Sequence, residues 1–201
     1  MSELKLKLSD GLKEATGSIS GEDVDGPLEV LSIFSRLKQT KRTGWVMRGV
    51  ENPESISDHC FRVAMFGMYL ALEDPSLDLN KVVKMGLVHD CGESIVGDVT
   101  PCEHHISEAL KSGNEDKALW RLDEMGGKEI LYPLWREFED GKTPEAAAVK
   151  QLDKLEMILQ AVEYERSQGL VLDDFFESSR KVFKHPVIVR WAKQIEAQRK
   201  K

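Results

Sequence analysis

The stretch that decides the fold is residues 82–90, which read VVKMGLVHD. Apart from Lys84, every residue up to Val88 is apolar, so a helix here would be apolar on nearly all sides, as is typical of a helix buried in the centre of a domain. Asp78 is placed to cap the start of that helix. His89 and Asp90 stand where the apolar run ends, and they are therefore the first candidates for a buried functional site.

Helical periodicity continues over nearly all of the chain, and no segment gives a convincing strand pair. We expect a first helix from Pro27 to about Lys38, and a later helix capped by Ser57 or Asp58 that carries His59 in its first turn. The apolar residues at helical spacing in the first helix are Leu28, Leu31, Phe34 and Leu37, and a loop through Thr43 and Gly44 follows it. Further helices are predicted after Thr100-Pro101, at 116–125 and 130–138, from Thr143-Pro144 past Val162, at 174–183 and after Pro186, with a loop or weak helix around 112–114. The sequence therefore predicts an all-α helical bundle.

Length, charge and cysteine content limit the functions open to the chain. Its 201 residues suit one domain, which we place at 27–201 behind a flexible arm at 1–26. The net charge of −7 disfavours nucleic acid polymers and anionic membranes as partners. Three cysteines cannot all pair with one another, and no stretch resembles a signal peptide or a membrane span. We expect a soluble intracellular protein, in the cytoplasm first, with the nucleus as the alternative.

Two distant residues extend the candidate site. His59 lies upstream of the His89-Asp90 pair, and Asp153 lies downstream beside an apolar stripe formed by Leu152, Leu155, Leu159 and Val162. Two imidazoles and two carboxylates suit a divalent metal that keeps positions open for water and substrate. Such a metal would lie between the central helices. The alternative for each residue alone is the commoner one: a hydrogen-bonded core histidine, or an aspartate in an interhelical salt bridge.

Two further acids are candidates for catalysis. Glu93 follows His89 by four residues, so the two share a helix face if the helix continues that far. A carboxylate there can orient a water molecule or accept its proton. Asp98 follows a glycine turn, and it is a candidate either to protonate a leaving group or to support the metal ligands.

Four motifs carry a resemblance to a known family. They are RTGW at 42–45, PESISDH at 53–59, LVHD at 87–90 followed by Glu93, Gly97, Asp98 and Thr100-Pro101, and VKQLDK at 149–154. The chain resembles the HD-domain phosphohydrolases, and within them the HD-domain-containing protein 2 type, which is related to bacterial 5′-deoxynucleotidases. The resemblance covers roughly Leu28 to Trp191.

The resemblance implies an HD-type helical fold and a divalent cation, Mn²⁺, Co²⁺, Mg²⁺ or Zn²⁺, held by His59, His89, Asp90 and Asp153. It also implies hydrolysis of deoxyribonucleoside 5′-monophosphates to deoxyribonucleoside and inorganic phosphate, and a homodimer. Catalytic roles are implied for Glu93 and Asp98, and phosphate and sugar contacts for Arg42 and Trp45. The rival functions are an HD-type phosphodiesterase or pyrophosphohydrolase, and a non-catalytic helical binding or scaffold protein.

Two points stay open in the sequence. Relatives tend to carry a basic cluster after Thr100-Pro101, whereas this chain has Glu103-His104-His105-Ile106 and only scattered lysines. His104 and His105 are either a surface pair or a supplementary metal contact. Trp45 is either a wall that rejects a ribose 2′-hydroxyl or a core anchor for its loop.

Overall fold

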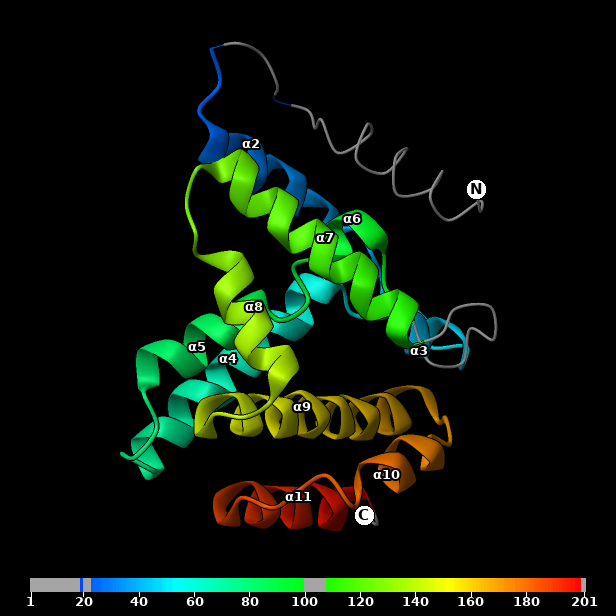
Figure 1. Cartoon of the computed structure of the whole chain (residues 1–201). Helices are drawn as coiled ribbons and strands as arrows, with labels where there is room; N and C mark the ends of the chain where they lie inside the picture. The colour runs from blue at the N-terminus through cyan, green and yellow to red at the C-terminus, as the bar shows by residue number, and fades with distance from the viewer. Residues whose placement is uncertain (1–18, 20–22, 100–107, 200–201) are drawn as a thin grey trace.

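The structure, a computed structural model, describes residues 19, 23–99 and 108–199. These residues form helices joined by turns, with an isolated antiparallel bridge between Lys41 and Ser55. In chain order the elements are α2 (Gly26–Ile33), the 3-10 helix η1 (Phe34–Lys38), α3 (Thr43–Val46), α4 (Ile56–Glu73), α5 (Leu79–Val88), α6 (Glu93–Val96), α7 (Glu108–Gly126), α8 (Leu131–Asp140), α9 (Pro144–Gln168), α10 (Asp173–Ser179) and α11 (Pro186–Arg199) (Figure 1). The predicted all-α fold is confirmed.

The long helix α9 lies in the middle of the fold, between α4, α5 and α8 on one side and α10 and α11 on the other (Figure 1). Thr143 caps its start by accepting a hydrogen bond from the backbone N–H of Ala146. The predicted stripe packs as expected: Leu152, Leu155 and Val162 are buried, and Leu159 packs partly buried against the same core. Three polar residues in the middle of α9 are buried as well: Gln151, Glu156 and Gln160.

Helices α4 and α5 approach each other closely because glycines stand at their contact points. A Cβ on Gly67 would lie 2.6 Å from Cγ1 of Val82, and a Cβ on Gly86 would lie 2.9 Å from the Cα of Ala64. A side chain at either position would push the helices apart. The close packing brings the start of α4 beside the end of α5.

The start of α4 differs from the predicted one. Ser55 is the N-cap, and it exchanges hydrogen bonds with Asp58: Ser55 Oγ accepts from the Asp58 backbone N–H, and Asp58 Oδ2 accepts from that of Ser55. The prediction that Ser57 or Asp58 is the cap is therefore wrong, although Asp58 completes the capping box. His59 still lies at the end of the first turn, as expected.

The N-terminal helix also differs from the prediction. It is α-helical only to Ile33 and continues as a 3-10 helix to Lys38. Val30 and Ile33 are buried in a second core with Ala118 and Leu122 of α7, whereas Leu28 and Leu31 are 48% and 63% exposed. The second half of the predicted stripe is confirmed, because Leu37 is buried and Phe34 packs partly buried against the core. In the first half, contact with α7 buries Val30 and Ile33 in place of Leu28 and Leu31.

One segment predicted as a loop is helical, and the segment predicted as a loop or weak helix is helical as well. Thr43 and Gly44 belong to α3, a short helix that the weak helix propensity of these residues concealed. The polar residues 112–114 lie inside α7. The helix expected after Thr100-Pro101 and most of the arm at 1–26 lie outside the described residues, so the division into an arm and one domain stays a prediction. Within the described ranges, no helix combines the length and hydrophobicity needed to cross a bilayer.

Candidate active site

Three separate segments bring His59, His89, Asp90 and Asp153 together. His59 comes from the first turn of α4, His89 and Asp90 follow the last turn of α5, and Asp153 lies in the middle of α9. The Nε2 atom of His59 lies 3.3 Å from Nε2 of His89, 3.3 Å from Oδ1 of Asp153 and 3.7 Å from Oδ2 of Asp90. His89 Nε2 lies 3.4 Å from the same Asp90 oxygen. His59, His89 and Asp90 each offer a donor atom within 4.8 Å of the other two, and Asp153 joins this group through its contact with His59.

The other ring nitrogen of each histidine is held by an acceptor. His59 Nδ1 lies 2.5 Å from Oε2 of Glu156, and His89 Nδ1 lies 2.9 Å from the carbonyl oxygen of Gly86. A proton on each Nδ1 leaves each Nε2 with its lone pair directed at the other donor atoms, which is how proteins usually orient metal-binding histidines. The donor set and its orientation thus fit a divalent metal.

Glu156 is a site residue that the sequence analysis missed. Its side chain is fully buried, and Oε1 accepts a hydrogen bond of 2.8 Å from Nε of Arg62. One signal was available: Glu156 follows Asp153 by three residues in a helix, so the two acids share a face. The interaction with His59 and Arg62 keeps the pKa of Glu156 below its ordinary value, although burial acts in the opposite direction.

The electrostatics of the site favour a cation. Burial lowers the pKa of His59, as does the nearby charge of Arg42, yet Glu156 and Asp153 outweigh both and raise it to about 9. Arg42 itself lies against the carboxylates, with Nη1 3.1 Å from Oδ2 of Asp90 and Nη2 3.9 Å from Oδ1 of Asp153. Carboxylates outnumber fixed cations here, so a positive charge among them is stabilised.

Glu93 lies beside this cluster in an unusual environment. Its side chain is 3% exposed, and its Oε2 has no hydrogen-bond partner among the described residues. Burial, reinforced by Asp90 and Asp98, raises the pKa of Glu93 well above its ordinary value. Oε1 lies 3.9 Å from Nζ of Lys111, which comes from α7.

The condition for Glu93 and His89 to share a helix face is not met. The helix does not continue from His89, because α5 ends at Val88 and a series of tight turns leads into α6, which begins at Glu93. The acid nevertheless lines the same pocket as Asp90.

Asp98 and Arg42 are linked through the start of α3. Oδ2 of Asp98 accepts a hydrogen bond of 2.6 Å from the backbone N–H of Thr43, and the Thr43 hydroxyl donates to the Asp98 backbone carbonyl. These bonds fix the residue that follows Arg42. Of the two roles considered for Asp98, its contacts support a positioning role. Asp98 also lines the pocket, so its catalytic role is a question for experiment.

Trp45 lies in the wall of the site but is packed tightly. It is 2% exposed, its Nε1 donates to Oε1 of Glu54 at 2.8 Å, and its ring stacks on Phe175 at 4.3 Å between centroids. Tyr164 contacts it edge-on. The anchoring role is thus visible in its contacts, and Trp45 also belongs to the pocket lining.

A pocket of about 510 Å³ opens in front of these residues, a volume within the usual range for small-molecule sites. Its lining includes all six of the following candidate residues: Arg42, Trp45, Asp90, Glu93, Asp98 and Asp153. The remaining two candidates, His59 and His89, lie behind Asp90 and Asp153 and are 0% and 4% exposed. His104 and His105 lie outside the described residues.

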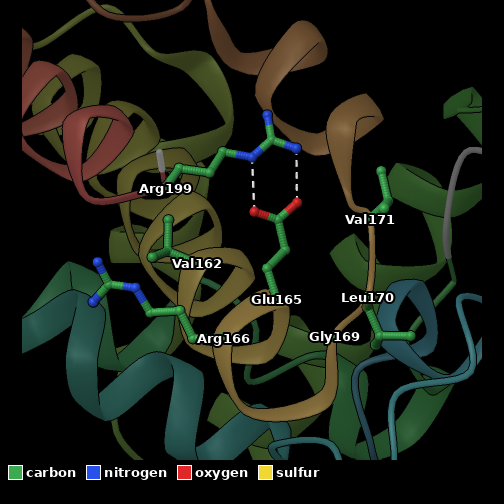
Figure 2. A pocket seen from close by; sticks show the side chains of 7 residues that line it. All are labelled: Val162, Glu165, Arg166, Gly169, Leu170, Val171 and Arg199. Atoms are coloured by element: carbon green, nitrogen blue, oxygen red, sulfur yellow. Dashed lines mark hydrogen bonds and ion pairs between the residues drawn. The ribbon is translucent and has the colours of Figure 1, made fainter. Parts of the chain in front are cut away.

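A second hollow, at the C-terminal end of α9, offers less chemistry. Figure 2 shows that Glu165 and Arg199, its charged pair, face each other, with both carboxylate oxygens accepting hydrogen bonds of 2.7 Å from the guanidinium. These charges satisfy each other, and none of the candidate residues lines this hollow. The first pocket is therefore the candidate active site.

The fold and the site define the class of this protein, and comparison with known families gives the same answer. The family described as HD domain matches residues 34–190, and the chain belongs to that family. It is 45% identical to 5′-deoxynucleotidase HDDC2 of Dictyostelium discoideum, over 86% of this chain and 98% of that protein. The human 5′-deoxynucleotidase HDDC2 is 38% identical, over 92% of each chain.

A solved structure shares the fold at greater distance. The crystal structure of a protein from Pyrococcus horikoshii aligns with a TM-score of 0.72 at 32% identity, covering 86% of this chain and 98% of that one. The resemblance seen in the four sequence motifs is therefore confirmed.

Proposed function

We propose that this chain is a metal-dependent 5′-deoxynucleotidase, which hydrolyses deoxyribonucleoside 5′-monophosphates to deoxyribonucleoside and inorganic phosphate. The observation that carries the proposal is the convergence of two histidine Nε2 atoms and two carboxylates beside a pocket that also contains a buried acid. The relatives named 5′-deoxynucleotidase support it, because this chain spans nearly their whole length.

In this proposal, His59, His89, Asp90 and Asp153 hold the divalent cation. When bound, such a cation lowers the pKa of water and polarises a phosphoryl oxygen. The donor set does not distinguish Mn²⁺, Co²⁺, Mg²⁺ and Zn²⁺, although imidazole nitrogen favours the transition metals over Mg²⁺.

The residues of the chain supply the remaining chemistry. Glu93 holds or accepts the proton of the attacking water at its carboxylate, a role suited to a buried acid whose pKa is raised well above its ordinary value. Arg42 presents a planar donor fork to the phosphate from the pocket wall. Asp98 keeps the start of α3 in place through Thr43 and is the second candidate to transfer a proton to the leaving group.

Selectivity for deoxyribose is assigned to Trp45. Its ring is immobilised by Glu54, Tyr164 and Phe175, so it cannot move aside for a bulkier sugar without loss of packing. A rigid wall of this kind excludes a 2′-hydroxyl by steric conflict. This role goes beyond the anchoring contacts that the structure displays.

Release of inorganic phosphate tests the proposal. We would measure it for matched ribo- and deoxyribonucleoside 5′-monophosphates, with and without chelator and with each metal added back. Phosphate from the deoxy substrates, lost on chelation and restored by metal, is expected. Turnover of a diester or pyrophosphate bond but of no monophosphate would favour the rival hydrolases, and no turnover of any ester would favour a binding protein.

Assembly as a homodimer in the cytoplasm is also part of the proposal. An apolar stripe on α4 supports the dimer, because Phe61, Tyr69 and Leu72 are 59% to 65% exposed and lie on one helix face with the partly buried Met65 and Met68. Phe61→Glu is expected to convert a dimer into a monomer in light scattering. If the wild-type protein is a monomer in the same measurement, the homodimer proposal is refuted.

A further inference from the structure

The candidate pocket has two chemically different parts. One part carries the charged residues around Asp90 and Asp153. The other, from α3, the turn after it, α9 and α10, carries Trp45, Met47, Met157 and Phe175, with the Arg48–Asp174 ion pair and Ser178. A nucleoside monophosphate has the same division, because its phosphate is anionic and its base is planar and largely apolar.

Two residues in the second part, Arg48 and Phe175, are held in place by their neighbours. The ring of Phe175 stacks on Trp45 at an interplanar angle of 30°. The guanidinium of Arg48 lies 5.4 Å from the centroid of Phe175. Arg48 also donates to Oδ2 of Asp174 through Nε, at 3.0 Å, and through Nη2.

Arg48 is not completely covered by these contacts. Its side chain is 32% exposed while it lines the pocket. A guanidinium plane held by an acid and an aromatic ring loses little conformational freedom when a flat group packs on it. Phenyl rings and guanidinium planes are the surfaces on which proteins stack nucleobases without a strong demand on base identity.

We infer that Arg48 and Phe175 form the nucleobase subsite of this pocket, contacting the base while the phosphate lies at Arg42 and the metal ligands. The inference rests on the proposed nucleotidase function and adds to it the surface that recognises the base. Neither residue takes part in the phosphate chemistry. Their loss therefore weakens recognition of nucleotides relative to a sugar phosphate that has no base.

The test compares a deoxyribonucleoside 5′-monophosphate with 2-deoxyribose 5-phosphate, which keeps the sugar and phosphate but lacks the base. The variants are Arg48→Gln and Phe175→Leu. The matched controls are Arg190→Gln, which removes an arginine paired with Glu73 on the surface, and Phe66→Leu, which removes a partly buried ring that packs on Trp191. Neither control residue lines the pocket.

We expect each subsite variant to lower kcat/KM for the nucleotide about tenfold, the lower part of the range for loss of a base-stacking contact. For 2-deoxyribose 5-phosphate, kcat/KM of Arg48→Gln should stay within about twofold of the wild type, whereas Phe175→Leu, which also loosens Trp45, should lower it less than it does for the nucleotide. Both controls should stay within about twofold of the wild type on both substrates. An equal fall on the two substrates would show that the residues only support the site. No fall on either would show that the base lies elsewhere, and both outcomes overturn the inference.

Failure of the proposed function gives a different pattern. If the wild type releases phosphate from no nucleotide, calorimetry on the same proteins measures binding of the nucleotide and of the sugar phosphate. Weaker nucleotide binding in both subsite variants, with unchanged sugar phosphate binding, would support the nucleobase subsite even though the nucleotidase proposal had failed. Nucleotide binding that is equal in the variants and the wild type would refute the nucleobase subsite as well.

Discussion

Glu156 gives the sharpest test of how the metal site is built. It touches no substrate and lines no part of the candidate pocket, but its Oε2 lies 2.5 Å from Nδ1 of His59, and both side chains are 0% exposed. If this carboxylate orients the ring and makes Nε2 a better donor, its removal weakens metal binding without removing a metal ligand. Loss of such a supporting partner usually costs about 10- to 100-fold in metal affinity, or about 1.4 to 2.7 kcal/mol.

Two substitutions divide that range. Glu156→Gln keeps an oxygen that can accept the Nδ1 hydrogen, so we expect the metal Kd to rise about tenfold. Glu156→Ala removes the acceptor, so about 100-fold is expected. The matched control is Glu163→Gln, because Glu163 also pairs with Arg62, through Nη1 at 2.9 Å, but lies 48% exposed and does not contact His59.

The assay is competition between the protein and a chelating dye for Mn²⁺ or Co²⁺, with folding monitored by circular dichroism. Nitrogen-15 NMR of the His59 ring reports the tautomer, which a purely structural role for Glu156 would leave unchanged. A metal Kd within about twofold of the wild type in both Glu156 variants, with the fold intact, would refute the reasoning.

Four further outcomes follow from the site. Asp90→Ala should lower the metal content of the purified protein, measured by mass spectrometry, and an unchanged content would remove Asp90 from the ligand set. Glu93→Ala should keep the metal but lose roughly two to four orders of magnitude in kcat, the usual size of a general acid–base contribution, whereas wild-type turnover would point to Asp98 instead. Trp45→Ala should raise kcat/KM for ribo- relative to deoxyribonucleotides, while Arg42→Ala should weaken both alike; an unchanged ratio in a folded Trp45→Ala protein would return Trp45 to packing alone. Because His59 has a pKa raised to about 9, it is protonated below that pH, and metal binding must release the proton. Affinity for Mn²⁺ should therefore rise as the pH approaches 9, and calorimetry in buffers of different ionisation enthalpy should detect the released proton. An affinity that does not change with pH would contradict this.

The sequence revealed the central helix and the residues at its end more clearly than their surroundings. A run as apolar as 82–88 has few alternatives to burial, and polar residues placed directly after it are conspicuous. His59 and Asp153 were recognisable as partners chiefly through their motifs, since nothing in spacing alone joins residues from helices so far apart in the chain.

Other features depend on tertiary contacts that no local pattern encodes. Glu156 looks like any acid of a long helix until α4 places Arg62 and His59 against it. The helix α3 exists where Asp98 satisfies the backbone N–H of Thr43, although propensity there is poor. Leu28 and Leu31 show the opposite outcome. Their helical spacing suits a buried face, but α7 packs against Val30 and Ile33 and leaves these two side chains exposed.

The glycine at the contact between α4 and α5 governs the site from a distance. Gly86 lets the two helices meet at Ala64, and its carbonyl oxygen holds the ring of His89. His59 lies in α4 and His89 directly follows α5, so the distance between these two helices sets the distance between the two Nε2 atoms. Under the proposed function, the ionic radius that the centre accepts is then set by a residue that offers the ion no atom. A methyl group added at Gly86 would push α4 and α5 apart and widen the space between the two histidines. The preference for one ion over another would then change although all four proposed metal ligands are still present.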